Sequence, residues 1–150
     1  MSFKSLGIDA DICEALESKG ITSPFPIQEQ AIPVALSGTD VIGQAKTGTG
    51  KTLGFGLPLI QALGENPAPG VQALVVVPTR ELALQVSEDL ILATANRPTT
   101  VVAIYGGKAY EGQVAALEGG AQIVVGTPGR LLDLAKQKLM SLSNVTFMVL

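Results

Sequence analysis

One stretch of the sequence has the residue types and spacing needed to hold a chain of phosphates. Two glycines and a lysine stand directly before a helical pattern, and a threonine follows the lysine. Glycines let backbone N–H groups curl around a phosphate, and the N-terminus of the next helix adds partial positive charge. We expect Lys51 to reach the β- and γ-phosphates of a nucleotide and the Thr52 hydroxyl to bind Mg²⁺. The stretch comprises Ala45, Lys46, Thr47, Gly48, Thr49, Gly50, Lys51 and Thr52.

The strict form of this loop motif begins with glycine, where this chain has Ala45. The alternative interpretation is a glycine-rich turn without a ligand. The position of the stretch, after an apolar run and before a helical one, favours phosphate binding.

Three later segments combine a strand end with glycines, a helix start or a cation. Thr79 and Thr127 are typical helix caps, and Pro128 suits a first helical position. Arg80 and Arg130 each fall in a first turn, where a cation opposes the helix dipole unless an anion binds. Each segment also has a structural alternative. The segment at Arg80 fits a capped surface helix, the one at Gly106 a plain turn, and the one at Arg130 a structural helix start. The candidate residues are Pro78, Thr79, Arg80, Gly106, Gly107, Thr127, Pro128, Gly129 and Arg130.

The elements that would position these residues alternate between strands and helices. Apolar runs predict strands at 40–44, 72–77, 99–105, 121–125 and 145–150. Helical patterns lie between them at about 51–64, 80–95, 109–118 and 128–138. This alternation predicts an α/β fold with an open, mainly parallel, doubly wound sheet and helices on both faces. Ligands of such sheets bind at the carboxyl ends of the strands, where all four segments fall.

Two further helices precede this alternation. Residues 9–20 combine a possible Asp9 cap with apolar side chains at i+4 spacing and Gly20 at the end. Residues 26–37 predict a helix that opens on Pro26 and is bent or broken near Pro33. We therefore expect an N-terminal helical segment at 1–38 and a phosphate-loop core at 39–150.

Two residues near the N-terminus suit recognition of an adenine base. The Gln28 amide donates and accepts hydrogen bonds at once, which matches the N6/N7 edge of adenine. The aromatic ring of Phe3 offers a stacking surface. The alternatives are a core anchor for Phe3 and a solvated helix residue for Gln28.

Composition excludes several other classes of chemistry. The chain has 150 residues, 47% of them hydrophobic, which fits one folded domain rather than a disordered segment. One cysteine and no histidine exclude an intramolecular disulfide, a Cys/His metal cluster and nucleophile–histidine catalysis. No apolar run is long enough to span a membrane and the N-terminal residues lack the apolar core of a signal peptide, so we expect a cytoplasmic protein.

The net charge of −3 gives no general attraction for nucleic acid, so binding must come from local sites. The three segments at the strand ends together offer helix N-termini and glycines, with one cation in each segment, and all of these are good phosphate ligands. No strand carries spaced aromatic residues for stacking on bases. The sequence thus predicts a track for a phosphodiester backbone beside a nucleotide site, read by backbone and shape.

The chain resembles the DEAD-box RNA helicases. Phe3 with residues 20–28 is similar to that family's adenine-reading Q motif, and residues 45–52 are similar to its motif I, which normally begins with alanine. Residues 78–83 resemble motif Ia, Gly106 and Gly107 the GG motif, and residues 127–130 motif Ib.

The resemblance implies a RecA-like first domain that binds ATP and Mg²⁺. It also implies RNA contacts through Arg80, Gly106, Gly107, Thr127, Gly129 and Arg130. The family's acidic D-E-A-D motif would follow the strand that ends at Leu150, so the resemblance implies that the RecA-like core at 39–150 is incomplete at its C-terminus. A second RecA-like domain would be the partner that closes on both ligands. We expect these 150 residues alone to bind adenine nucleotide weakly and to hydrolyse almost none.

Two other functions remain open. A non-catalytic nucleotide- or RNA-binding module could use the loop as a fold element, and a small-molecule kinase could use it for transfer to a hydroxyl. DNA in place of RNA is a lesser variant.

Overall fold

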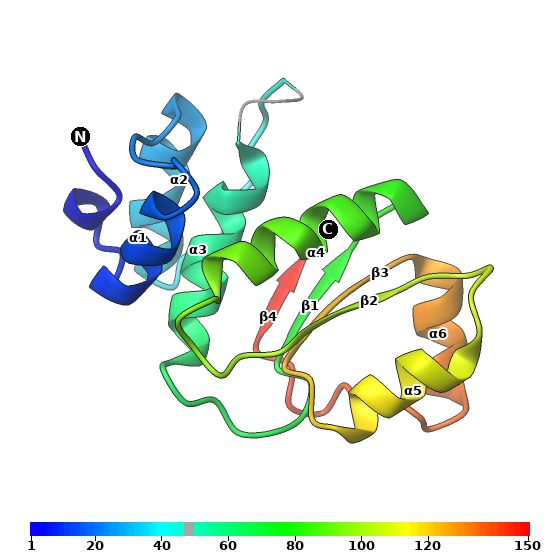
Figure 1. Ribbon diagram of the computed structural model, residues 1–150. Coiled ribbons are helices and arrows are strands. Elements are labelled where there is room, and N and C mark those ends of the chain that lie inside the picture. Colours follow the sequence, from blue (N-terminus) through cyan, green and yellow to red (C-terminus); the bar gives the residue numbers. More distant parts are fainter. Residues whose placement is uncertain (47–49) are drawn as a thin grey trace. The chain divides into compact units, whose positions relative to one another are not determined.

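The computed structural model describes residues 1–46 and 50–150 (Figure 1). Internal contacts divide the chain into two compact units. The first unit comprises Met1–Glu65 and Leu92–Pro98, and the second comprises Asn66–Ile91 and Thr99–Leu150. None of the helices in the described part of the chain is both long and apolar enough to cross a membrane.

The first unit is helical. It contains a short 3-10 helix η1 (Lys4–Leu6) and the α-helices α1 (Ala10–Glu17), α2 (Pro26–Leu36) and α3 (Lys51–Leu63). The predicted apolar spacing is confirmed, since Ile8, Ile12 and Leu16 are all buried. Near the end of α3, the Gln61 side chain bonds the N–H of Asp9 and the carbonyl of Gly7, both at 2.8 Å. The N-terminal arm is therefore tied to α3, the helix that begins at Lys51.

Helix α2 was expected to be either bent or broken near Pro33, and it is not broken there. Pro33 lies inside the helix, which continues to Leu36. A proline removes one backbone hydrogen bond of the helix, and here the helix continues for three residues beyond that loss.

The side-chain cap suggested for Asp9 does not form. Asp9 is the N-cap residue of α1, but its carboxylate makes no cap hydrogen bond. It accepts a hydrogen bond from Arg97 Nη2 at 2.8 Å instead, and Asp11 accepts one from Arg97 Nε at 2.7 Å. The hydrogen bond from Arg97 lowers the pKa of Asp11. A buried arginine far along the chain thus takes the carboxylate that a cap would use.

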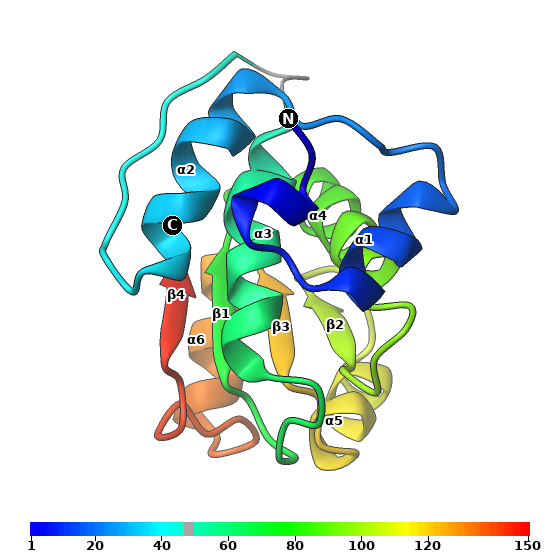
Figure 2. The same cartoon turned by 90° about the vertical axis from the view of Figure 1, so that its left-hand side faces the viewer.

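The second unit is an open sheet of four parallel strands in the order β2-β3-β1-β4 (Figure 2). The strands are β1 (Ala73–Val76), β2 (Val101–Ile104), β3 (Ile123–Gly126) and β4 (Phe147–Val149). Its helices are α4 (Arg80–Ala93, within this unit as far as Ile91), α5 (Tyr110–Glu118) and α6 (Pro128–Lys136). Helix α4 covers one face of the sheet, while α5 and α6 cover the other (Figures 1 and 2). The predicted doubly wound α/β fold is confirmed.

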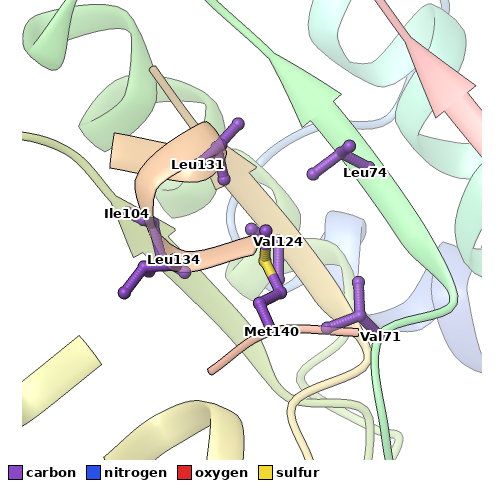
Figure 3. Close-up of a cluster of buried hydrophobic side chains, with 7 residues drawn as sticks. All are labelled: Val71, Leu74, Ile104, Val124, Leu131, Leu134 and Met140. Atoms are coloured by element: carbon purple, nitrogen blue, oxygen red, sulfur yellow. The ribbon is translucent and has the colours of Figure 1, made fainter. Parts of the chain in front are cut away.

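A buried apolar cluster fixes α6 against the sheet (Figure 3). Leu131 and Leu134 project from α6 toward side chains from three strands and two loops. This packing sets the position of the first turn of α6, which carries Arg130. The cluster consists of Val71, Leu74, Ile104, Val124, Leu131, Leu134 and Met140.

The strand expected at residues 40–44 does not form. These residues have neither helix nor strand conformation, and Ile42 is fully exposed. A short apolar run becomes a strand only when a neighbouring strand pairs with its backbone and covers its side chains. The apolar pattern was therefore insufficient evidence for a strand.

Candidate functional site

The start of α3 presents backbone donors without a side-chain cap. Its N-cap residue, Gly50, has a left-handed backbone with φ of +81° and makes no cap hydrogen bond. Lys51 is exposed and Thr52 is half-buried in the first turn. The first backbone N–H groups of a helix lack intrahelical partners, so they can bind an anion. Thr47, Gly48 and Thr49, which were predicted to belong to the phosphate loop, lie outside the described residues.

Gln28 holds the end of this loop in place. Its side chain is buried in α2, where Oε1 accepts from the N–H of Phe25 at 2.9 Å and Nε2 donates to the carbonyl of Gly50 at 3.0 Å. The approach is so close that a Cβ at Gly50 would lie 2.2 Å from Nε2. Glycine is therefore required at position 50 both by this contact and by its backbone angle. The alternative of a solvated Gln28 is wrong.

Two phenylalanine rings of the first unit differ in exposure. Phe3, the predicted stacking ring, is 3% exposed, as its alternative role of core anchor requires. Phe25 is 51% exposed and its ring packs beside Gly50. The signal for Phe25 was its place three residues before Gln28, but sequence alone could not tell which ring is buried.

In the second unit, the three later segments meet at one edge of the sheet. The parallel register pairs Val76 and Ile104 with Gly126, so the carboxyl ends of β1, β2 and β3 are level. Backbone bonds continue past the strands, from Val77 N–H to Gly126 O at 2.9 Å and from Thr127 N–H to Ile104 O at 3.0 Å. The expectation that these segments share one edge is confirmed.

The helix starts at this edge follow the predicted signals in part. Thr79 Oγ1 accepts from the N–H of Leu82 at 3.2 Å, as a cap does. Pro128 is the first residue of α6, and Thr127 is its N-cap without a side-chain cap bond. The Thr127 hydroxyl is thus not used to cap α6. Gly106, Gly107 and Gly129 are exposed.

Three cations at this edge lie against two tyrosine rings. The Cζ of Arg80 is 5.2 Å and the Nζ of Lys108 is 5.8 Å from the centroid of Tyr105. The Cζ of Arg130 is 4.3 Å from the centroid of Tyr110. In the part of the chain that the structure describes, none of these three cations forms an ion pair with a carboxylate. The edge therefore offers three cations without carboxylate partners among the described residues, although the chain as a whole is acidic.

Sequence reasoning missed Gln113, which connects these segments. This buried side chain of α5 donates from Nε2 to the carbonyl of Tyr105 at 3.1 Å and accepts at Oε1 from Arg130 Nη1 at 3.0 Å. The sequence gives no signal for this role, because the burial of Gln113 becomes evident only in the folded chain.

Comparison with known proteins gives the family. The family model described as DEAD/DEAH box helicase matches residues 25–150. The DEAD-box ATP-dependent RNA helicase CshA of Streptococcus pneumoniae serotype 4 is 49% identical over 150 residues, which cover 100% of this chain and 28% of that protein. CshA of Bacillus subtilis is 44% identical over 151 residues, which cover 100% of this chain and 30% of that protein. The chain thus spans less than a third of the length of these relatives.

Two solved structures are similar over nearly the whole chain. A DEAD box protein from Methanococcus jannaschii has a TM-score of 0.91 at 40% identity and is matched over 99% of this chain and 40% of its own. The RNA helicase Prp28 from Chaetomium thermophilum bound to ADP has a TM-score of 0.89 at 38% identity, over 97% of this chain and 37% of its own. With a family model that matches most of its length, the chain belongs to the DEAD/DEAH box helicase family.

Proposed function

We propose that this chain forms the ATP-binding part of an ATP-dependent RNA helicase. The observation that carries the proposal is the uncapped N-terminus of α3, where Lys51 and Thr52 follow the left-handed Gly50. Relatives that align with the entire chain are named ATP-dependent RNA helicases, and one similar structure was solved with ADP.

The residues at this helix start fit a nucleotide with its metal ion. The backbone N–H groups of the first turn and the Lys51 ammonium suit the phosphates. The hydroxyl of Thr52, half-buried beside them, is the oxygen ligand that would hold Mg²⁺. When bound, Mg²⁺ would neutralise charge on the phosphates. Selection of adenine by Gln28 remains a prediction, because that amide is buried and both of its polar groups are already bonded.

We assign RNA to the edge of the second unit. Arg80 and Arg130, with the exposed glycines at positions 106, 107 and 129, offer charge and free backbone to phosphates. Both tyrosines lie under cations, and Tyr105 is buried, so the edge suits the RNA backbone rather than stacked bases. In the whole protein, we propose, a second RecA-like domain closes on both ligands and remodels short RNA duplexes. The 150 residues alone would bind adenine nucleotide weakly and hydrolyse almost none.

A thermal-shift titration tests the nucleotide site. Saturation of the full chain with ADP and Mg²⁺ to about ten times the Kd should raise its Tm by about 3–6 °C. Lys51→Ala should remove most of this shift, whereas Lys19→Ala, a change of another exposed lysine in the same unit, should not. If ADP and ATP at millimolar concentration do not shift the wild-type Tm, the result would contradict the nucleotide site and favour a non-catalytic module that uses the loop only as a fold element.

Two further assays test the remaining parts of the proposal. Fluorescence anisotropy with a labelled oligouridylate should show binding that Arg80→Ala weakens, and a matched DNA strand at the same salt concentration distinguishes the two nucleic acids. ATP turnover by the isolated chain should not exceed that of Lys51→Ala. Phosphorylated product from hydroxyl acceptors would indicate a kinase instead.

A further inference from the structure

The guanidinium of Arg130 is held more tightly than a surface arginine needs to be. Its Nη1 donates to the carbonyl of Lys108 and to Gln113 Oε1, both at 3.0 Å. Its Cζ also lies 4.3 Å from the ring centroid of Tyr110. Long cationic side chains lose substantial rotamer freedom when they are fixed in this way. Three separate contacts therefore keep Arg130 in one geometry.

These contacts determine which side of the guanidinium is left for a ligand. An arginine has five N–H donors, and the two on Nη1 are both used within the chain. In the part of the chain that the structure describes, the Nε–H and Nη2–H groups of Arg130 have no hydrogen-bond partner. These two nitrogens form the edge that binds a phosphate through two parallel hydrogen bonds.

Gln113 is the central residue of this arrangement. Gln113 is buried, and both polar groups of its amide are hydrogen-bonded. Its Nε2 donates to the carbonyl of Tyr105, directly after β2, and its Oε1 accepts from Arg130 in the first turn of α6. The loop between these points carries Gly106, Gly107 and the Lys108 carbonyl that also binds Arg130. One side chain thereby fixes both the loop and the cation relative to each other.

We infer that Gln113 is a positioning residue for RNA: it holds the Arg130 guanidinium and the 105–108 loop ready for a phosphate before RNA binds. The inference rests on the proposed phosphate contact of Arg130. An ordered cation avoids the entropy loss that a mobile one would suffer on binding, so Gln113 raises RNA affinity without touching RNA.

The test measures oligouridylate binding by anisotropy across a salt series, with each variant shown to be folded by circular dichroism. Gln113→Met keeps the side-chain length and removes both hydrogen bonds. It should weaken binding about two- to tenfold, the effect of ordering one long side chain, and leave the salt slope unchanged. Arg130→Ala should reduce the slope of log Kd against log salt by about 0.7, the value for one phosphate contact on a single strand.

A double variant separates positioning from a general structural effect. In an Arg130→Ala background, Gln113→Met should cause no further loss of affinity, because the two residues act through one contact. The matched control is Gln122→Met, since Gln122 is another buried glutamine of this unit, whose Oε1 accepts from the N–H of Thr100 at 2.7 Å. It should lower stability and leave RNA affinity unchanged. If Gln113→Met does not fold, Tyr110→Leu removes the ring under Arg130 and should have the same effect.

Three results would overturn the inference while RNA binding itself stands. They are wild-type affinity in Gln113→Met, an equal loss in the Arg130→Ala background, and an equal loss in Gln122→Met. Absence of oligouridylate binding by the wild-type chain would instead refute the proposed RNA contact, and this inference with it.

Discussion

The ion pairs of Arg97 allow the stability of the first unit to be predicted in detail. The Arg97 side chain is 2% exposed and donates from Nε and Nη2 to Asp11 at 2.7 and 2.9 Å, and from Nη2 to Asp9 at 2.8 Å. Its Nη1 is buried without a hydrogen-bond partner in the described part of the chain. Asp11→Ala would thus remove two of three charged hydrogen bonds and leave a buried cation held by one.

The expected cost follows from how exposed each carboxylate is. Removal of one partner from a fully buried ion pair costs about 3–5 kcal/mol. The Asp11 side chain is 31% exposed, so water replaces part of the loss and we expect about 2–3 kcal/mol. The Asp9 side chain is 46% exposed and makes one of the bonds, so Asp9→Ala should cost about 0.5–1 kcal/mol. For a chain of this size, Asp11→Ala should lower the Tm by about 4–12 °C.

Urea unfolding followed by circular dichroism measures these free energies, and a double-mutant cycle isolates the pair. In an Arg97→Met background, Asp11→Ala should cost less than about 1 kcal/mol, because no buried cation is then left unpaired. The reasoning fails if Asp11→Ala costs no more than Asp9→Ala, or if its cost is the same with methionine at position 97.

Three other measurements test separate parts of the structure. Gln28→Met should lower the free energy of unfolding by about 1–3 kcal/mol and weaken ADP binding, because the hydrogen bond to the Gly50 carbonyl at the loop end is lost together with the one from the Phe25 N–H; Gln30→Met, an exposed change on the same helix, should do neither. Gly126→Ala should cost about 1–3 kcal/mol in urea unfolding, since its Cβ would lie 2.6 Å from a backbone carbonyl oxygen, whereas Gly112→Ala has open space and should be neutral or stabilising. The pKa of Asp11 lies below its ordinary value of 3.8 in the folded chain, so the unfolded chain takes up the proton first and stability falls as the pH drops below about 4. An acid titration of the unfolding free energy should be flatter for Asp11→Asn; equal steepness would contradict this account.

Features set by local sequence could be predicted well. The helix starts at Arg80 and Pro128 were placed correctly, because threonine before a first turn and proline within it act over a few residues. The sheet also followed from local patterns. Continuous apolar runs such as the one around Val75 indicate strands covered on both faces, and four of the five expected strands form.

Features that depend on distant parts of the chain could not be predicted. The strand at residues 40–44 needed a neighbour that its own sequence does not specify. The Asp9 carboxylate does not cap α1, because it binds Arg97, which is 88 residues away in the sequence. Burial of Gln113 similarly arises from packing of α5 near the end of β2, so its link to Arg130 has no signature in the sequence.

A diffraction structure of the chain with ADP and Mg²⁺ tests the central claim most directly. The account predicts the diphosphate at the N-terminal turn of α3, within reach of the Lys51 ammonium and the backbone N–H groups of that turn, with the Thr52 hydroxyl toward the metal ion. ADP bound away from this turn, or a turn left empty at saturating ADP, would contradict it.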